Sequence, residues 1–578
     1  MLLDTKTERN IPKYNQLISK RRVAMAVGAG MLIVGALSNM FSWSYHNHIG
    51  VDYIEQCGRM DPILPEFNKS IKMIFESPDF KEKAISRLAG AIQIPTEVFD
   101  DNPSPSEDIE YYHEFFKLHD YLVNSFPLVS KHLKLEKVNE VNLLFTWEGK
   151  DKKLKPMMLT SHQDVVPVDP ETVSQWTYPP FSGHYDASSD LIYGRGALDC
   201  KTLLVAQLAA IEQLIEDGFE PTRTVIVALG FDEETAGLHG ARTMGKFLHE
   251  RYGDNGIYSI VDEGSMVAEI SKNVFIAAPV VQEKGYLDVN ITVLGNGGHS
   301  SIPPEHTTIG VAAEIISSLE NKPFKFEFSL ENPFYGFLVC MAEHSNSLPT
   351  EFKKAIIEAR FDEKERKKLV EFISQRPEMR ELIRTSQAVD VFHGGMKANA
   401  LPQVSTFLVN HRIDIQSSVQ EVLESDLSVA REVAEKYGYG LYLADEEVIP
   451  CTDVGSITVT GYKPLEPSPY SPTGGSQVWD IFSGTIQNVF QNGLLRNNSE
   501  AEVYVTTNTI SANSDTKHYW ALTKNIYRFF GNVLPQGLWK TVHSVDETIP
   551  ASAHLTSIAF VYEYIVNVQE GANEDSLP

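Results

Sequence analysis

Histidine and carboxylate side chains follow three short apolar segments of this chain. The segments are residues 157–160, 224–231 and 257–261, and the side chains after them are, in the same order, His162 and Asp164, Glu233 and Glu234, and Asp262. Near-continuous apolar runs are typical of strands in a parallel sheet covered on both faces. Ligands bind at the carboxyl ends of such strands, so we expect these side chains to meet at one edge of a sheet.

A further carboxylate, Asp199, follows Gly194-Arg195-Gly196-Ala197-Leu198, where two glycines permit a tight turn. Carboxylates gathered in one place repel one another and call for a cation. Imidazole with several carboxylates suits zinc, and a shared carboxylate suits a two-metal site. Each residue alone has a plainer interpretation: a hydrogen-bonded structural histidine, a solvated acidic turn, or a helix cap at Asp164.

The elements around these residues predict an α/β protein. Leu204, Leu208, Ile211 and Ile215 recur at helical spacing, whereas apolar residues alternate with polar ones over 287–293 and 407–415. Alternation predicts strands with one wet face, and hence a smaller α+β domain inserted into the catalytic α/β domain. The predicted order is a tail (1–22), a transmembrane helix (23–43), a stalk (44–80), a first catalytic segment (81–282), an inserted lid (283–445) and a second catalytic segment (446–578).

Composition excludes several classes of protein. The 578 residues include 50 Lys and Arg against 77 Asp and Glu, a formal net charge of −27. Nucleic-acid binders need a basic face, so we expect no nucleic-acid partner. Four scattered cysteines are too few for a disulfide framework or a CxxC zinc site. They leave the disulfide state open.

The amino terminus predicts a membrane anchor. Residues 23–43 carry no charge and as a helix would be about 31 Å long, enough to cross a bilayer core. Residues 1–22 hold six basic and two acidic residues, so the positive-inside rule places this tail in the cytosol. A cleaved signal peptide would have a shorter apolar run. Beyond the span, Asn68, Asn290 and Asn497 stand in N-x-S/T triplets and are candidate glycosylation sites.

Taken together, the motifs resemble those of the M20 family of zinc peptidases and aminoacylases, in the order of that family. They are Ser161–Pro167, Gly194–Lys201, Asp232–Glu234, Val261–Gly264, Glu283–Tyr286, Gly297–Ser301, Asn399–Pro402 and His543–Glu547. The resemblance implies two zinc ions per subunit, bridged by Asp199. It assigns His162 and Asp262 to one ion, and Glu234 and His543 to the other.

The same resemblance implies roles for five residues around the metals. Asp164 would orient His162, and Glu233 would act as the general base. His299 would stabilise the oxyanion, and Asn399 with Arg412 would bind the free carboxylate of the substrate. In many members the matching histidine comes from a partner subunit, so the resemblance allows a homodimer.

The anchor, the acidic loop near residue 100 and the chain length are most similar to the fungal vacuolar Gly-X carboxypeptidase branch of that family. This implies a small-peptide substrate cleaved at its C-terminal bond, with glycine favoured before that bond. An N-acyl amino-acid hydrolase with the same dizinc site is the alternative. The branch also implies a vacuolar location, as a single-pass protein with a cytosolic N-terminus, and Lys6 and Lys13 of the tail as possible ubiquitination sites.

Overall fold

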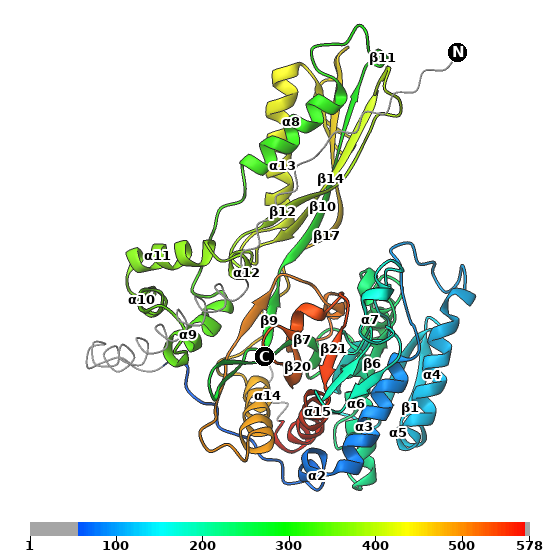
Figure 1. Ribbon diagram of the computed structural model, residues 1–578, viewed down its shortest axis with the longest axis vertical. Coiled ribbons are helices and arrows are strands. Elements are labelled where there is room, and N and C mark those ends of the chain that lie inside the picture. Colours follow the sequence, from blue (N-terminus) through cyan, green and yellow to red (C-terminus); the bar gives the residue numbers. More distant parts are fainter. Residues whose placement is uncertain (1–55, 573–578) are drawn as a thin grey trace, which may run out of the picture.

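The computed structural model describes residues 56–572 as a catalytic body, an elongated lid and a helical segment between them (Figure 1). The predicted anchor at 23–43, together with Lys6 and Lys13, lies outside the described residues. Among the helices of residues 56–572, none combines the length and apolar character needed to span a bilayer.

The catalytic body is built on a ten-stranded mixed sheet. Its centre is the three predicted parallel strands, β3 (Met157–His162), β6 (Val225–Gly230) and β7 (Ile260–Ser271), joined by β20 (Ile526–Val533) parallel to β7. A hairpin of β1 (Lys134–Val138) and β2 (Asn142–Trp147) adds antiparallel strands beside β6.

Helices cover both faces of this sheet, as the apolar runs predict. Successive strand side chains point to opposite faces. Accordingly Leu159 and Val227 pack under one set of helices and Met158 and Ile226 under another. The first set is α2 (Ile71–Glu76), α3 (Pro78–Ile92), α4 (His113–Ser125), α5 (Pro127–His132), α6 (Lys201–Glu216), α14 (Gln477–Asn488) and α15 (Ala551–Gly571). The second face carries α7 (Ala241–Tyr252).

The far side of the sheet carries a helical segment within the insertion. The strands on this side of the body sheet are β8 (Val274–Ala277), β9 (Val280–Glu283), β18 (Glu502–Val505) and β19 (Asn508–Ile510). The helices of the segment are α9 (Phe334–His344), α10 (Thr350–Glu358), α11 (Glu363–Ser374) and α12 (Pro377–Arg380). Ile276 and Tyr504 of the sheet share a core with these helices. A disulfide joins Cys57 to Cys340 of α9, so the start of the described chain is fixed to this segment.

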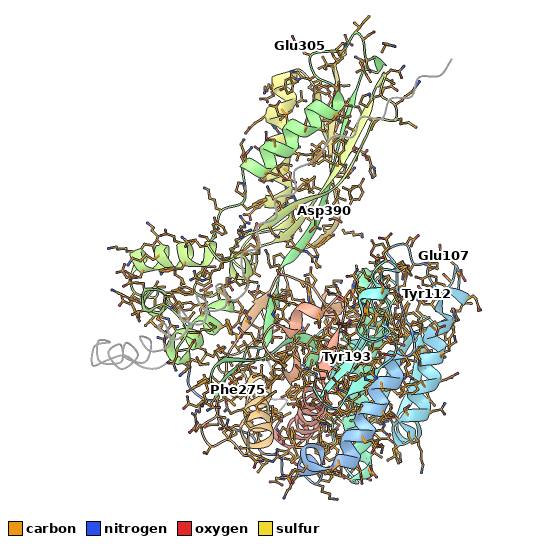
Figure 2. The ribbon with its side chains drawn as sticks, viewed as in Figure 1. Glu107, Tyr112, Tyr193, Phe275, Glu305 and Asp390 are labelled. Atoms are coloured by element: carbon orange, nitrogen blue, oxygen red, sulfur yellow. A yellow bond between two sulfur atoms is a disulfide. The ribbon has the colours of Figure 1, made fainter. Side chains whose placement is uncertain are left out.

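The lid is the predicted α+β insertion. Its six-stranded sheet has the order β12 (Ser386–Gly394), β14 (Val404–Ile413), β10 (Gly285–Gly295), β17 (Gly455–Leu465), β15 (Gly440–Leu443) and β16 (Glu446–Ile449). The helices α8 (Thr308–Asn321) and α13 (Val419–Tyr437) cover one face. The short strands β11 (Gly298–His299) and β13 (Ala400–Leu401) pair at its far end, near Glu305 (Figures 1 and 2).

Two predicted domain boundaries are corrected. The lid ends at Leu465 rather than at residue 445, because β17 pairs with the central lid strand β10. The predicted stalk at 44–80 is a packed part of the body from residue 56 onward. Ile74 is fully buried, and the backbone N–H of Ile63 donates to the carbonyl of Gly484. The prolines of this segment indicate a loop, but its apolar side chains find partners in the body.

Candidate metal centre and active site

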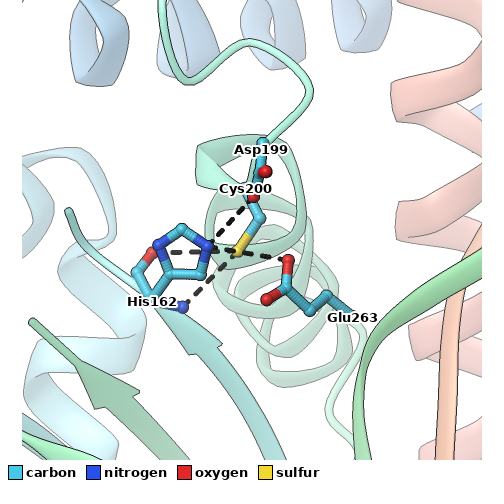
Figure 3. Close-up of side chains that lie close together, drawn as sticks. All are labelled: His162, Asp199, Cys200 and Glu263. Atoms are coloured by element: carbon cyan, nitrogen blue, oxygen red, sulfur yellow. Dashed lines mark hydrogen bonds and ion pairs between the residues drawn. The ribbon is translucent and has the colours of Figure 1, made fainter. Parts of the chain in front are cut away.

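Three residues from separate elements converge beyond the end of β3 (Figure 3). His162 Nε2 lies 3.1 Å from Asp199 Oδ1 and 3.6 Å from Glu263 Oε2. His162 ends β3, Glu263 lies on β7, and Asp199 precedes α6. The thiol of Cys200 lies in the same cluster and is fully buried. Donor atoms within 4.8 Å of one another can share one metal ion.

A second group shares Asp199 with the first. Asp199 Oδ2 lies 3.1 Å from His543 Nε2, which lies 3.2 Å from Glu234 Oε2. Glu234 belongs to the short helix η3 (Glu233–Thr235), just after β6. One oxygen of Asp199 thus faces each group, which is the arrangement of a carboxylate that bridges two ions.

The structure brings Glu263 into the cluster with His162, whereas the sequence predicts Asp262 as the ligand. Adjacent strand residues point to opposite faces of the sheet, so only one of the two can face His162. The Asp262 carboxyl turns instead toward Glu283 and Ser514. Strand alternation alone could not decide between the two residues, since the register of β7 relative to β3 is a tertiary feature.

Hydrogen bonds beneath the cluster orient its members. The Nδ1 of His162 lies 2.9 Å from the carbonyl oxygen of Asp164 and 3.4 Å from its Oδ1. The other carboxylate oxygen of Asp164 accepts the backbone N–H of Glu234 at 3.0 Å. Asp164 therefore contacts His162 and holds the loop of Glu234, and its role as an orienting residue stays a prediction.

Glu233 stands beside Glu234 at the start of η3 and is half-buried. Burial raises the pKa of its carboxyl, and the nearby charges of His162 and Lys517 oppose that rise. A carboxylate beside the metal cluster, outside both ligand groups, has the placement expected of a general base. The sequence alone indicates no role for the Asp515–Tyr519 segment, from which Lys517 comes.

The charge balance of the cluster fits a cation. Burial, followed by repulsion from Asp199, raises the pKa of Glu234 to about 8, and burial raises that of Glu263 well above its usual range. Hydrogen bonds to Asp199 and then to Glu234 raise the pKa of His543 to about 10. Buried carboxylates that are costly to ionise become favourable metal ligands, and Glu234 Oε1 has no other partner. Imidazole and carboxylate donors together are those that zinc accepts.

Comparison with known proteins assigns the family. The model of peptidase family M20/M25/M40 matches residues 158–567. This chain belongs to the M20 family. It is 53% identical to carboxypeptidase S of Saccharomyces cerevisiae over 91% of both chains. It is 31% identical to the human N-fatty-acyl-amino acid synthase/hydrolase PM20D1 over 83% of this chain and 86% of that one.

Solved structures share the fold at lower identity. An M20 family metallo-carboxypeptidase, Sso-CP2 from Sulfolobus solfataricus, superposes with a TM-score of 0.56 at 19% identity, covering 84% of this chain and 99% of the other. The 53% identity to carboxypeptidase S confirms the expected fungal Gly-X carboxypeptidase branch, and this M20 protein is a metallocarboxypeptidase by family and by its near relatives.

The predicted substrate residues of this M20 peptidase lie at opposite ends of the lid. His299 and Asn399 stand at the far end, by the β11–β13 pair. Arg412 lies at the base, where its Nη1 donates to Asn513 Oδ1 of the body at 3.2 Å. Strand β14 between them starts at Val404, and eight residues at about 3.4 Å each span roughly 27 Å. Asn399 and Arg412 of one chain therefore do not meet at one carboxylate.

The three candidate glycosylation sites differ in exposure. Asn497 is exposed, as a glycan acceptor requires. Asn68 is half-buried and its amide donates to the carbonyl of Pro65. Asn290 lies on the central lid strand β10, on the face away from α8 and α13. Modification of each remains a prediction.

Proposed function

We propose that this chain is a zinc-dependent carboxypeptidase that hydrolyses the C-terminal peptide bond of small peptides and favours glycine before that bond. The observation that carries the proposal is the pair of ligand groups sharing Asp199, with Glu233 outside both. Asp199, His162 and Glu263 would hold one zinc, and Asp199, Glu234 and His543 the other. The 53% identity to carboxypeptidase S supports the peptidase assignment over acyl hydrolysis.

The zinc that these residues would hold would supply Lewis-acid chemistry, polarising the scissile carbonyl and acidifying water. Glu233 then takes a proton from the attacking water and delivers it to the leaving amine. Burial raises the pKa of the Glu233 carboxyl, and a higher pKa makes a carboxylate a stronger base. His299 donates to the developing oxyanion, and Asn399 and Arg412 bind the free carboxylate of the substrate.

The distance between the two ends of the lid favours a homodimer. His299 and Asn399 of one chain would reach the active site of the second chain. There they would lie beside the Arg412 of that second chain, at the base of its lid. The exposed apolar side chains Ile302, Phe392 and Met396 near the far end and on the edge strand β12 support a covered surface there. A cross-linked dimer, or complementation between a His299→Ala chain and a Glu233→Gln chain, tests this arrangement.

We also propose that the body resides in the vacuole lumen behind the 23–43 anchor. The Cys57–Cys340 disulfide supports an oxidising compartment. Glycans at Asn68, Asn290 and Asn497 belong to this proposal, as does ubiquitination of Lys6 and Lys13. Loss of vacuolar delivery on Lys6→Arg/Lys13→Arg substitution would support the tail signal, and normal delivery would remove it.

The enzymatic test uses an N-blocked Gly-Leu dipeptide and follows leucine release by the full-length protein. Release that stops on chelation and returns with zinc supports the proposal. The acyl-hydrolase alternative would be supported if protein that holds about two zincs does not cleave the peptide but does cleave an N-acyl amino acid. The PM20D1 relative is named for that activity.

A further inference from the structure

Glu547 is a buried carboxylate that contacts the metal-bearing loop at several points. Its Oε1 accepts backbone N–H bonds from Gly196, Leu198 and Asp199 at 3.0, 2.9 and 3.0 Å. Its side chain has no exposed surface. Three converging N–H groups form an anion-binding concavity, and here the anion belongs to the protein itself. The loop that presents the shared ligand Asp199 is therefore wrapped around one oxygen atom.

The second oxygen of Glu547 is also held. It accepts from Arg195 Nη1 at 2.7 Å, and the same guanidinium nitrogen lies 3.4 Å from the carbonyl oxygen of Ser544. Arg195 in turn stacks over Trp176, with 5.5 Å from the guanidinium carbon to the ring centre. Arg195, which begins the Asp199 loop, thus contacts the loop that carries His543 at both Ser544 and Glu547.

The backbone joins these two loops as well. The carbonyl of Glu547 accepts the N–H of Gly194 at 2.9 Å. Just beyond, β21 (Thr548–Pro550) pairs antiparallel with β5 (Leu191–Tyr193), which itself pairs with β4 (His184–Asp186). Asp199 therefore lies on the loop that follows β5, and His543 lies on the loop that precedes its partner strand β21. The pairing of these two strands brings the two loops together.

The His543 loop has a backbone that needs outside support. His543 and Asp546 have φ angles of 55° and 59°, in the left-handed region that residues other than glycine seldom adopt. The Asp546 carboxylate accepts from the backbone N–H and the hydroxyl of Thr177, both at 2.7 Å. Such conformations persist where the surroundings over-determine them. Glu547, one residue further on, supplies most of the contacts toward Asp199.

We propose that Glu547 is a positioning residue that sets the placement of Asp199 relative to His543 and thereby the zinc affinity of the centre. The inference rests on the proposed dizinc function and extends it to a residue outside both ligand groups. Supporting partners of metal ligands change metal affinity by about 10- to 100-fold when they are altered.

Both oxygens of Glu547 must accept hydrogen bonds in this role, because donors face each of them. In Glu547→Gln, one of the two positions becomes an N–H₂ group. It would then oppose either the three backbone N–H groups or Arg195, so one set of buried donors loses its acceptor. The loop must shift to relieve that conflict, although side-chain size is unchanged.

The experiment compares Glu547→Gln with Glu212→Gln as a matched control. Glu212 is also a buried carboxylate that accepts a backbone N–H, from Val129 at 2.8 Å, and lies 3.7 Å from Arg87, away from the metal cluster. Zinc affinity is measured by competition with a chromophoric chelator, zinc content by metal analysis, and folding by the unfolding midpoint of the metal-free protein.

We expect Glu547→Gln to lower zinc affinity by about 10- to 100-fold, whereas Glu212→Gln keeps wild-type zinc affinity despite any loss of stability. Wild-type zinc affinity in folded Glu547→Gln, or an equal loss in both variants, overturns the inference. If Glu547→Gln does not fold, Arg195→Lys decides in its place: reduced zinc affinity supports the inference and wild-type affinity overturns it. A wild-type protein that binds no zinc would instead overturn the proposed function.

Discussion

Neutralising Glu234 should stabilise the metal-free protein while weakening its zinc binding. Its carboxyl is only 7% exposed, and burial followed by repulsion from Asp199 raises its pKa from 4.5 to about 8. An acid whose pKa is raised on folding favours the unfolded state once the pH exceeds its unfolded pKa. The penalty therefore grows between pH 4.5 and 8 and is absent below that range.

The size of the effect follows from the pKa difference. At pH 7 the solution is about 2.5 pH units above the unfolded pKa of 4.5 and still below the folded pKa. One pKa unit corresponds to about 1.4 kcal/mol, so the penalty on the folded state is about 3 kcal/mol. Glu234→Gln removes it but weakens the pairing with His543, 3.2 Å away. We therefore expect a net gain of about 1–3 kcal/mol for the metal-free variant at pH 7.

The assay is urea unfolding of metal-stripped and zinc-loaded proteins at pH 5.5, 7 and 8. The gain of the stripped variant should increase with pH. Zinc should reverse the order of the two proteins, because each occupied site adds about 4.1 kcal/mol when free zinc is 1,000-fold above its Kd, which exceeds the expected gain of the variant. A stripped variant that is no more stable than stripped wild type at pH 8, or equal stabilisation of both by zinc, would refute the reasoning.

Three further outcomes are expected. Glu233→Gln should keep the zinc content of the wild type and lower kcat by at least ~10²-fold. Metal analysis tests the zinc content and leucine release tests kcat. Near-normal turnover would remove Glu233 from the mechanism. Glu263→Gln should lose one zinc by metal analysis whereas Asp262→Asn keeps both, and the opposite result would restore the sequence prediction. Cys57→Ser should lower the free energy of unfolding by about 2–5 kcal/mol, measured by urea unfolding. Cys451→Ser is the control, because Cys451 is an exposed free cysteine. Equal stability of the two variants would contradict a stabilising disulfide.

Much of the centre could be predicted because its ligands come directly after strands. The apolar runs before His162 and Glu233 form β3 and β6, and parallel strands bring the residues at their carboxyl ends to one edge. Local pattern also identified the lid strands, since Leu287 and Val289 alternate with polar residues along β10. These features depend on chemistry within a few residues, which a single sequence contains.

Other features depend on segments far apart in the chain. The choice of Glu263 over Asp262 depends on how β7 faces β3. The pairing of Cys57 with Cys340 joins positions separated by 283 residues. The packing of residues 56–76 against the body involves partners such as Gly484, more than 400 positions away.

The sequence by itself determined which residues could hold metal and which elements would present them, because periodicity and strand ends are local properties. Tertiary structure decided which carboxylate of an adjacent pair faces His162, how far Arg412 lies from His299, and that Glu547 ties the Asp199 loop to the His543 loop. Those outcomes depend on side chains that meet only after the sheet, the lid and the terminal segment have packed together.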